Sequence, residues 1–557
     1  MSSDSDRVAF DESVSPQDNT VLFQQKRWTS ITDSSSNGGV FNGQIQFDLN
    51  TLSSQNQWTD LSQAYIQFPV KLSINSATAV GTAAQQNFDN FAASIKNGFH
   101  QFVDSVSIVL GGSNIQSSQI YENVNTTYKM LSEWSSDELR KYGPTLGLSL
   151  DDYQFAADGA PTARDGLDNV SIATVSPAFA GVQYPVERNT GFKERAQFLN
   201  STTSSSSAAT AILGNNATNE GKGRVQSVNT STTIAANSDV YCQFMLATIR
   251  LKDISDAIAK LPLCKSLKGF IYVNYNAASC QYTATASTGA VKTQAPVMTP
   301  IYGRCMPAML NTTASGSADL SLTFRAEVSG VQSTNLTAAG PTFNNARLYA
   351  PYYVGSPEVD RALSMKKTIR FNERFVTSFP LNANGGNFNG TLSPGITNPQ
   401  RVILLPYLTG SASGTAGLTS FAVNPLLSPW DIAGCGGSSP FAGLKDLQIV
   451  VGGQPMWQSP QQFQYENFVQ EVAQQGVDGG IVSQTNSGLL NQRLWNQLYR
   501  YYTCDVSRRM GADDGASKAI QLTCSNSTTA PMTVIAMIWY QREITIDTAM
   551  GSVNQSL

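Results

Sequence analysis

Charge is what this sequence has least of. Asp, Glu, Lys and Arg make up 14% of its 557 residues, against roughly 25% in an average soluble protein. Small polar residues and glycine take their place. Because the centres of protein interfaces are depleted in Lys, Glu and Asp, this composition is typical of a subunit that packs against many neighbours. A β-rich secreted protein with hydroxyl-rich loops would have the same composition, so both classes stay open at this point.

Histidine is almost absent, since His100 is the only one in the chain. A histidine metal cluster or a cupin site needs several, and a Ser-His-Asp or Cys-His arrangement would have to use this single residue. It stands beside an expected strand with no nucleophile motif nearby, so we expect a structural role. No phosphate-binding glycine motif follows an expected strand. The sequence predicts that the chain is not an enzyme and has no catalytic, cofactor-binding or metal-binding residues and no cofactor.

Carboxylate pairs and aromatic residues are the other candidates for a site. We expect the pairs Asp151-Asp152 and Asp513-Asp514 to be solvated in loops, with calcium binding as the alternative. We expect five aromatic residues in the core or at subunit contacts rather than stacked on nucleic-acid bases: Tyr352, Tyr353, Trp495, Tyr501 and Tyr502.

Long apolar runs and basic runs are missing as well. No stretch approaches the roughly 18 apolar residues of a membrane-spanning helix, so we expect no membrane span. Residues 1–19 lack the pattern of a signal peptide and are expected to form a flexible, mildly acidic arm. The net charge is −4 and no Lys/Arg-rich segment occurs, which argues against direct sequence-specific binding of nucleic acid. We therefore expect the chain to be made and kept in a reducing, cytosol-like compartment.

The cysteine pattern agrees with a reducing compartment. The seven cysteines are odd in number and widely spaced, and none forms a CxxC pair. Free buried thiols are therefore expected rather than disulfides or metal ligands. They are Cys242, Cys264, Cys280, Cys305, Cys435, Cys504 and Cys524.

An internal repeat organises what is present. Asn37–Gly43 (NGGVFNG) returns 347 residues later as Asn384–Gly390 (NGGNFNG), with six of seven positions identical. Arg27-Trp28 stands ten residues before the first copy and Arg374-Phe375 ten before the second. Such a spacing is far too long for a solenoid repeat. It predicts two related domains, with the motif as the same turn between the first two strands of each and Phe41 and Phe388 starting the second strand.

Further landmarks recur in the same order. They are Val106–Gly112 with Leu447–Gly453, Tyr121–Asn123 with Tyr465–Asn467, Asn189–Gly191 with Asn486–Gly488, and the proline-bearing strand Ala64–Ile74 with Arg401–Tyr407. Several ordered matches with slowly drifting offsets indicate one design used twice.

Alternation of apolar and polar residues predicts about eight strands per copy. In the first copy these are Phe23–Ile31, Gln44–Leu49, Ala64–Ile74, Val106–Gly112, Val240–Leu251, Gly269–Asn276, Leu320–Val328 and Ala346–Val354. In the second they include Thr368–Val376, Arg401–Tyr407, Leu447–Gly453, Tyr499–Val506, Ala519–Cys524 and Met532–Ile546. A helical excursion follows the fourth strand of each copy. Residues 76–95 and 201–236 are expected as loops.

This pattern predicts an all-β chain of two consecutive eight-stranded antiparallel jelly-roll sandwiches with a few short helices and long loops. The expected divisions are the arm at 1–19, a first jelly roll at 20–355 with a large loop insertion at 151–239, and a second jelly roll at 356–557.

The motifs carry a resemblance. The NGGxFNG turns, the Ile-Val-x-Gly-Gly strand ends, Ala247–Ile254 and Ala346–Tyr353 look like the double jelly-roll major capsid proteins of virophages and polinton-like viruses, over about residues 20–546. The resemblance implies a homotrimer with a pseudo-hexagonal outline that tiles an icosahedral shell around double-stranded DNA. It implies contacts with neighbouring capsomers, separate penton and minor capsid proteins, and a place in the virion after synthesis in the host cytoplasm or a virus factory. A carbohydrate-binding or adhesive β-sandwich protein is the alternative function.

Overall fold

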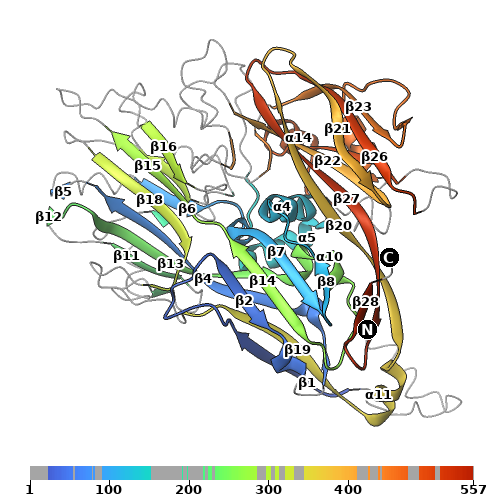
Figure 1. The fold of residues 1–557 in the computed structure, drawn as a ribbon. Coiled ribbons are helices and arrows are strands. Elements are labelled where there is room, and N and C mark those ends of the chain that lie inside the picture. Colours follow the sequence, from blue (N-terminus) through green and yellow to red (C-terminus); the bar gives the residue numbers. More distant parts are fainter. Residues whose placement is uncertain are drawn as a thin grey trace, which may run out of the picture.

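The chain folds into two groups of strands with helix α4 (Glu122–Glu133) between them (Figure 1). The predicted arm and most of the 151–239 insertion lie outside the part of the chain that the structure, a computed structural model, describes. The described residues are 23–53, 57–77, 80–81, 91–151, 191, 197–198, 218–219, 224–228, 233–284, 297–302, 308–312, 320–331, 344–409, 424–426, 437–439, 442–473, 488–507 and 515–555.

Eight strands of the first half form a jelly roll. In chain order they are β1 (Phe23–Thr32), β2 (Gln44–Asp48), β4 (Tyr65–Ser76), β7 (Val103–Leu110), β8 (Ser113–Gln116), β13 (Ser238–Arg250), β14 (Gly269–Tyr275) and β19 (Arg347–Gly355). Numbered one to eight, they pair as 1-8-3-6 in the β1-β19-β4-β13 sheet and as 2-7-4-5 in the β2-β14-β7-β8 sheet. Two antiparallel sheets exchanging strands in this way make a jelly roll.

The second half repeats this order with shorter connections. Its strands are β20 (Lys366–Leu381), β21 (Asn387–Ile396), β22 (Pro399–Leu408), β23 (Leu444–Val451), β24 (Gln454–Pro455), β25 (Tyr502–Asp505), β26 (Lys518–Asn526) and β27 (Met532–Asp547). The sheets are β20-β27-β22-β25 and β21-β26-β23-β24, which again read 1-8-3-6 and 2-7-4-5. The fold class predicted from the sequence is confirmed.

The predicted set of eight first-half strands contains one error. Leu320–Val328 is a strand (β18) that pairs with β4 and β15, but it is not one of the eight jelly-roll strands. The strand missing from the prediction is the short fifth strand, β8. Its counterpart β24 has two residues. Strands this short carry too little alternation to be detected from sequence. With β8 and β24 counted, the helix of each half follows the fifth strand and not the predicted fourth.

Additional strands extend the first half. They are β3 (Trp58–Thr59), β5 (Val80–Gly81), β6 (Phe91–Ile95), β9 (Gln197–Phe198), β10 (Thr218–Asn219), β11 (Arg224–Val228), β12 (Thr233–Ile234), β15 (Ala278–Ala284), β16 (Val297–Tyr302), β17 (Ala308–Thr312) and β18 (Leu320–Val328); the C-terminal β28 (Val553–Gln555) pairs with β27. The expectation of loops is therefore wrong at β5 and β6 in residues 76–95, and at β10, β11 and β12 in residues 201–236. β11 adds to the free edge of β13 through backbone hydrogen bonds, which need no hydrophobic alternation.

Short helices join the strands. The α-helices besides α4 are α2 (Asn50–Ser53), α5 (Ser136–Tyr142), α9 (Leu251–Ile254), α10 (Asp256–Ala259), α11 (Pro357–Leu363), α13 (Tyr465–Ala473) and α14 (Gln492–Gln497), and the 3-10 helices are η1 (Leu61–Gln63), η3 (Phe99–Phe102) and η4 (Gly143–Leu146). Two of these helices begin with a serine N-cap: the Ser135 hydroxyl accepts from Glu138 N–H at 3.1 Å, and Ser356 caps α11 ahead of proline. Each hydroxyl satisfies an N–H that the first helical turn leaves free.

The turns that join the fourth and fifth strands are a true structural repeat. Gly111 and Gly112 have φ of 55° and 83°, and Gly452 and Gly453 have φ of 58° and 84°. Positive φ at both central residues is what a two-residue type I′ hairpin requires, and glycine adopts it without strain. The flanking strands also match in register, because the apolar residues of β7 and β23 face the core at corresponding positions.

The Asn-Gly-Gly motif is less faithfully repeated. Both copies lie where the first strand joins the second, but β2 begins only at Gln44, after Phe41, whereas β21 contains Phe388. Phe41 therefore does not start a strand, and that prediction is wrong. The motif match also aligns Arg27 with Arg374. Arg27 lies on the same face of its strand as the buried Ile31, whereas Arg374 lies on the outer face of its sheet. An odd shift of one residue exchanges the two faces of a strand.

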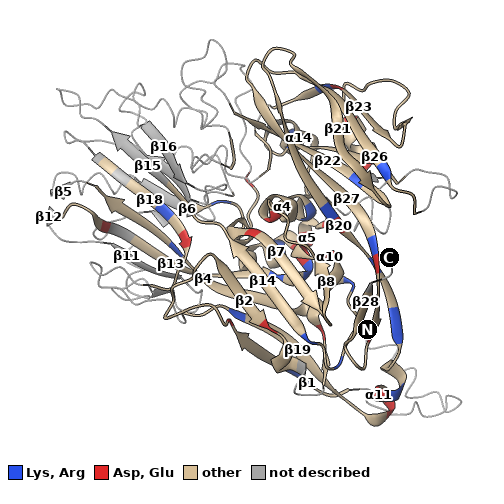
Figure 2. Cartoon of the chain, in the orientation of Figure 1, with Lys and Arg blue, Asp and Glu red and all other residues tan. Residues whose placement is uncertain are grey.

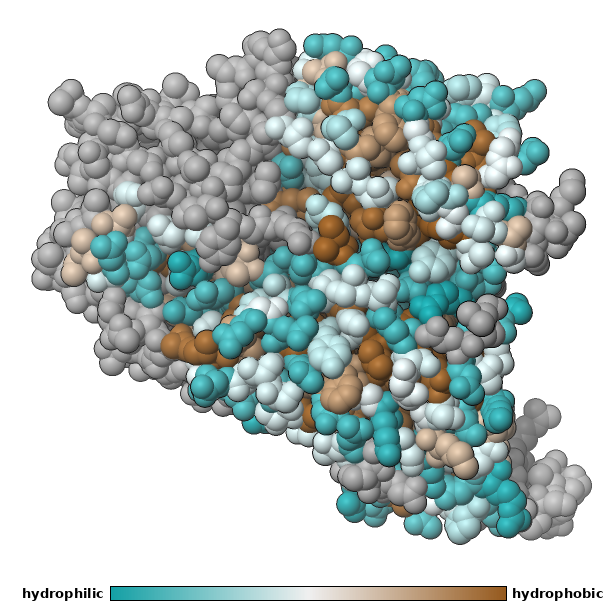
Figure 3. Space-filling model, viewed as in Figure 1, coloured by the Kyte–Doolittle hydropathy of each residue, from teal (hydrophilic) through white to brown (hydrophobic). Residues whose placement is uncertain are grey.

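Two large apolar clusters form the core, and each crosses from one half into the other. The first contains Ile66, Ile108 and Leu348 but also Phe371 and Ile544 of the second half. The second contains Val402 and Ile538 but also Val124 and Tyr128 of α4. The few charged residues are scattered over the strands (Figure 2), and apolar side chains reach the visible surface in patches (Figure 3).

Candidate functional site

The seam between the two jelly rolls holds many of the buried polar residues of the described chain. Its centre is α4, which has buried residues at every position from Glu122 to Ser132. On one side α4 packs against β7 and η3 of the first jelly roll. On the other side Tyr128 contacts the rings of Tyr501 and Trp539 of the second, with centroids 4.6 and 5.6 Å away. A helix buried on all sides acts as a wedge that fixes one roll against the other.

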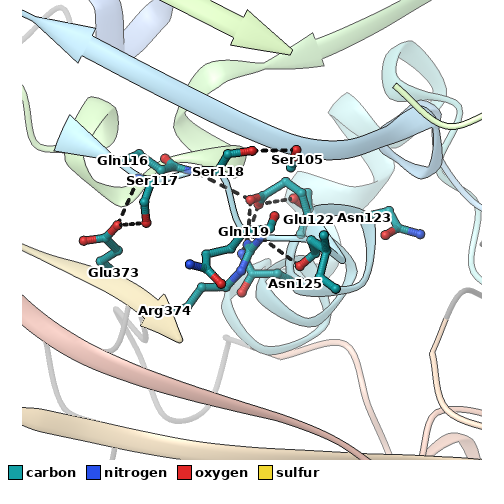
Figure 4. Close-up of polar contacts among 12 residues, drawn as sticks. Ser105, Gln116, Ser117, Ser118, Gln119, Glu122, Asn123, Asn125, Glu373 and Arg374 are labelled. Atoms are coloured by element: carbon teal, nitrogen blue, oxygen red, sulfur yellow. Dashed lines mark hydrogen bonds and ion pairs between the residues drawn. The ribbon is translucent and has the colours of Figure 1, made fainter. Parts of the chain in front are cut away.

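A buried ion pair crosses the seam (Figure 4). Arg374 Nη1 lies 2.6 Å from Glu122 Oε2, and the two side chains are 7% and 0% exposed. The second Arg374 nitrogen donates to the backbone oxygen of Gln119 at 2.8 Å. The carboxylate stands at the first residue of α4, where the helix dipole favours negative charge. Removing both charges from water costs free energy, which the ion pair offsets only with good geometry and additional hydrogen bonds. Because that geometry exists in one arrangement of the two halves, this contact specifies their orientation.

Glu373, next to Arg374 on β20, makes a second crossing. It accepts hydrogen bonds from the backbone and hydroxyl of Ser117 at 3.0 and 2.5 Å, and from Arg542 and Tyr540 at 2.5 and 3.0 Å. Burial acts to raise the pKa of Glu373, but the hydrogen bonds from Ser117 and Arg542 outweigh it and hold the pKa below its usual value. The side chain of Glu373 is thus kept ionised within the seam.

A row of large side chains forms the platform on which α4 rests. Arg374, Trp539 and Arg401 stand side by side on β20, β27 and β22. The Arg401 guanidinium lies 5.3 Å from the Trp539 ring centroid and donates to the Tyr128 hydroxyl at 3.2 Å. These three residues face away from the interior of the second jelly roll. Its outer sheet face is therefore buried by the first half of the same chain.

A small cavity of about 40 Å³ lies in this seam. It is lined from both halves, by α4, the loop after β8, α10 and β20. The backbone N–H of Asn372 donates across it to Asp256 at 2.8 Å. A space of this size accommodates a water molecule.

His100 lies in η3, buried under α4. Its Nε2 atom is 2.7 Å from the Thr127 hydroxyl and 3.2 Å from the Gln101 amide nitrogen. Burial lowers its pKa to about 3, because removal from water disfavours the charged imidazolium. These contacts agree with the structural role expected for His100. The predicted absence of catalytic and cofactor-binding residues stays a prediction.

Other candidates from the sequence have mixed outcomes. Asp151 is 2% exposed, so the expectation that it is solvated is wrong; its backbone N–H donates to the Tyr499 hydroxyl at 3.0 Å, which ties this end of the loop to the second half. The other three residues of the carboxylate pairs lie outside the described residues. Of the expected core aromatics, Trp495, Tyr501 and Tyr502 are buried and Tyr352 and Tyr353 are half-buried.

Four cysteines confirm the expected free buried thiols: Cys242, Cys264, Cys504 and Cys524. Burial raises the pKa of Cys264 and of Cys524 to about 12. The side chains of the other three are outside the described part of the chain. Within the described ranges, no group of three or more His, Cys, Asp or Glu side chains could hold a metal ion, and no helix has the length and hydropathy to cross a membrane.

The seam residues could not have been paired from sequence. Glu122 and Arg374 both stand in repeated motifs, but 252 positions separate them. The only local signal is a glutamate at the start of a helix. That signal also fits Glu466 of α13, which is exposed.

The chain is similar in structure to viral major capsid proteins. It aligns with the mavirus major capsid protein at a TM-score of 0.46 and 10% identity, over 98% of this chain and 94% of that one. Alignment with the Sputnik virophage structure gives 0.45 and 12%, over 98% and 91%. The faustovirus major capsid protein gives 0.41 and 11%, over 93% and 90%. Since these TM-scores are below 0.5, the assignment of the fold rests on the strand order of this chain.

No family model matches the sequence. No curated protein matches it either. The repeated strand order, the seam and the surfaces of the chain are therefore the basis for a functional proposal.

Proposed function

We propose that this chain is a major capsid protein, the structural subunit of an icosahedral virus shell. The observation that carries the proposal is the repeated jelly roll: two sandwiches of identical strand order in one chain, locked together by α4 and the Glu122–Arg374 pair. Three such chains in a ring present six similar sandwiches, which supplies the near-sixfold outline that a shell tile needs. Closed rings of this kind arise from head-to-tail contacts whose rotation closes.

The low charge supports the same proposal. Buried, unpaired charge destabilises a contact, and a subunit surrounded by neighbours on every edge has many contacts to satisfy. Where charges are buried in the seam they are paired: Glu122 with Arg374, and Glu373 with Arg542. With only 14% charged residues, few other positions need such a partner.

The proposal extends to partners and location. We propose that the trimers contact neighbouring capsomers, that separate penton and minor capsid proteins complete the shell, and that the assembled chain resides in the virion. Synthesis in the host cytoplasm or a virus factory belongs to the same proposal. The absence of a Lys/Arg-rich run in the sequence supports a shell protein that does not bind nucleic acid in a sequence-specific way.

We also propose the domain division suggested by the sequence, at residues 355 and 356. The eighth strand of the first jelly roll ends at Gly355, and the first strand of the second begins at Lys366. Only α11 stands between them. The arm at 1–19 and the 151–239 insertion remain part of this proposal.

The test is the mass and shape of the purified chain. Light scattering should give three times the chain mass of 59.8 kDa, and class averages from negative-stain microscopy should show a hexagonal outline. A monomer under all assembly conditions, with no threefold particles, would contradict the proposed function.

A carbohydrate-binding protein is the second candidate, favoured by one observation. Trp28 is 49% exposed, and its ring lies 5.6 Å from that of Tyr65 on the outer face of the first jelly roll. Exposed aromatic rings are suited to stacking on apolar faces of ligands. Saturable binding on a glycan array that is lost in Trp28→Ala would support this candidate, and retention of binding in that variant would exclude this surface.

A further inference from the structure

The seam is a front-to-back contact, because it joins different surfaces of two similar bodies. The first jelly roll contributes α4, the helix after its fifth strand. The second contributes the outer face of its β20-β27-β22-β25 sheet, through Arg374, Trp539 and Arg401. A heterologous contact of this kind leaves one copy of each surface unused, at opposite ends of the pair.

The unused helix surface belongs to the second jelly roll. α13 follows the fifth strand β24, as α4 follows β8, and Tyr465-Glu466-Asn467 repeats the Tyr121-Glu122-Asn123 at the start of α4. Whereas Glu122 is fully buried, Glu466 is exposed. Val469 is 40% exposed; its counterpart Asn125 is buried in the seam. The surface of α13 thus combines an acidic and an apolar side chain in contact with water.

The unused sheet surface belongs to the first jelly roll, at the β1–β19 edge. The rings of Tyr65 and Tyr349 stack with centroids 5.0 Å apart, and Trp28 lies against Tyr65. The Lys26 ammonium stands 5.6 Å from the Trp28 ring centroid and 5.4 Å from that of Tyr353. This basic and aromatic surface has the same chemistry as the arginine and tryptophan platform beneath α4.

We propose that α13 of one chain docks on this β1–β19 surface of a second copy, with Glu466 facing Lys26 and Val469 against the aromatic rings. The contact would repeat, between chains, the one that α4 makes within the chain. The charges are complementary, since α13 presents an acid and the β1–β19 surface presents a base, Lys26. The inference rests on the proposed function, because the second copy is the neighbour in the capsid trimer.

Charge reversal tests the contact in the full-length chain. The variants are Glu466→Lys, Lys26→Glu, and the combination of the two. Like charges brought together at an interface disfavour association. Charge reversal on α13 alone or on β1 alone should therefore raise the protein concentration at which half of the trimers are dissociated, by at least about ten-fold. The combination should restore association. Glu358→Lys is the matched control, an exposed glutamate on α11 that belongs to neither α13 nor β1, and should leave the trimer unchanged.

The outcomes separate the two proposals. A wild-type chain that never forms trimers contradicts the proposed function. A wild-type trimer that all the reversal variants also form, with unchanged dissociation, overturns the docking surface and leaves the capsid proposal standing. Loss of association in each single side that the combination does not restore also overturns it, because the paired charges would then not face each other.

Cross-linking gives a readout that does not depend on weakened association. Chains carrying Lys26→Cys and chains carrying Val469→Cys are assembled together and treated with a short bis-maleimide. The proposal predicts a covalent dimer only in the mixture, because each chain then supplies one of the two thiols. Intact mixed trimers that yield no such product would overturn the proposal.

Discussion

At the scale of single residues, charge in this protein is placed where it decides orientation. Arg374 and Glu122 bury both charges, in contrast to Arg370 and Glu543, whose side chains are 69% and 37% exposed. A buried pair contributes little net stability compared with apolar residues of the same shape, but removal of one partner is strongly destabilising. The pair therefore acts as a lock for one arrangement of the jelly rolls.

Arg374→Met should lower the free energy of unfolding by about 3–5 kcal/mol, because Glu122 then stays buried without a cation. Urea titration measures the loss. The double variant Arg374→Met with Glu122→Gln should lose less than the sum of the single variants, and strictly additive losses would mean that the side chains do not interact. Arg370→Ala is the control on an exposed pair, with an expected loss of at most about 1 kcal/mol.

His100 should make stability depend on pH. Its pKa is about 3 in the folded chain against 6.5 for an unburied imidazole. Between these values the unfolded chain binds the proton and the folded chain does not, so this part of the stability is present above pH 6.5 and is lost as the pH falls toward 3. The expected slope is about 1.4 kcal/mol per pH unit. Urea titrations from pH 6.5 to 4.5 should show a slope smaller by this amount in His100→Asn.

The imidazole can also be observed directly. Because the chain has one histidine, its NMR signal needs no assignment. We expect the signal to remain that of a neutral ring at pH 4.5 while the protein is folded. A midpoint near 6.5 in the folded protein would contradict the buried position under α4.

At the scale of elements, the Gly-Gly hairpins show how one local motif acquires two environments. Gly111 and Gly452 share the same φ within a few degrees. A Cβ atom on Gly111 would come within 2.7 Å of the backbone nitrogen of Val553 in β28, whereas on Gly452 it would meet only the flexible Lys518 side chain, at 3.3 Å. The hairpin of the first jelly roll thus also serves as a contact for the C-terminal strand.

Gly452→Ala should cost about 1–2 kcal/mol, the strain of a left-handed residue with a Cβ atom. Gly111→Ala should cost more, because β28 must move as well. Thermal unfolding compares the two variants. Gly112→Ala and Gly453→Ala are controls in open space and should cost equal amounts. Equal losses for Gly111→Ala and Gly452→Ala would show that β28 does not pack on the hairpin.

At the scale of the whole molecule, the two halves complete each other's cores. Phe371, Ile544 and Val553 pack into the first apolar cluster, and Val124 and Tyr128 pack into the second. Separation would expose these side chains to water, at roughly 1.5–3 kcal/mol for each large apolar residue. The halves are therefore expected to depend on each other although each has a complete set of strands.

Residues 1–355 and 356–557, produced separately, should aggregate or bind a dye for exposed apolar surface, and should form a soluble complex when produced together. Size-exclusion chromatography distinguishes these outcomes. As a control, a protease site inserted between Ser364 and Met365 should allow cleavage without separation of the halves. Two soluble, compact halves that do not associate would contradict the shared cores.

Much of this architecture follows from local patterns. Alternation identified most of the strands, because one face of each is buried, and the Gly-Gly turns fixed the register of β7 and β23. The same reasoning missed β8 and β24, which are too short to alternate, and β11, which is held by backbone hydrogen bonds. It also aligned Arg27 with Arg374, although the two face opposite sides of their sheets, because identity of letters does not reveal a shift of one residue.

The sequence by itself determined the two jelly rolls, the low charge and the positions of the tight turns, since each depends on neighbours within a few residues. Only the tertiary structure decided that α4 lies between the rolls, that Glu122 meets Arg374, and that α13 and the β1–β19 surface are left open. These features depend on residues hundreds of positions apart, which are brought together when the apolar faces of both sandwiches are buried. The repeat predicts two similar bodies, and their packing determines which surfaces remain for a neighbour.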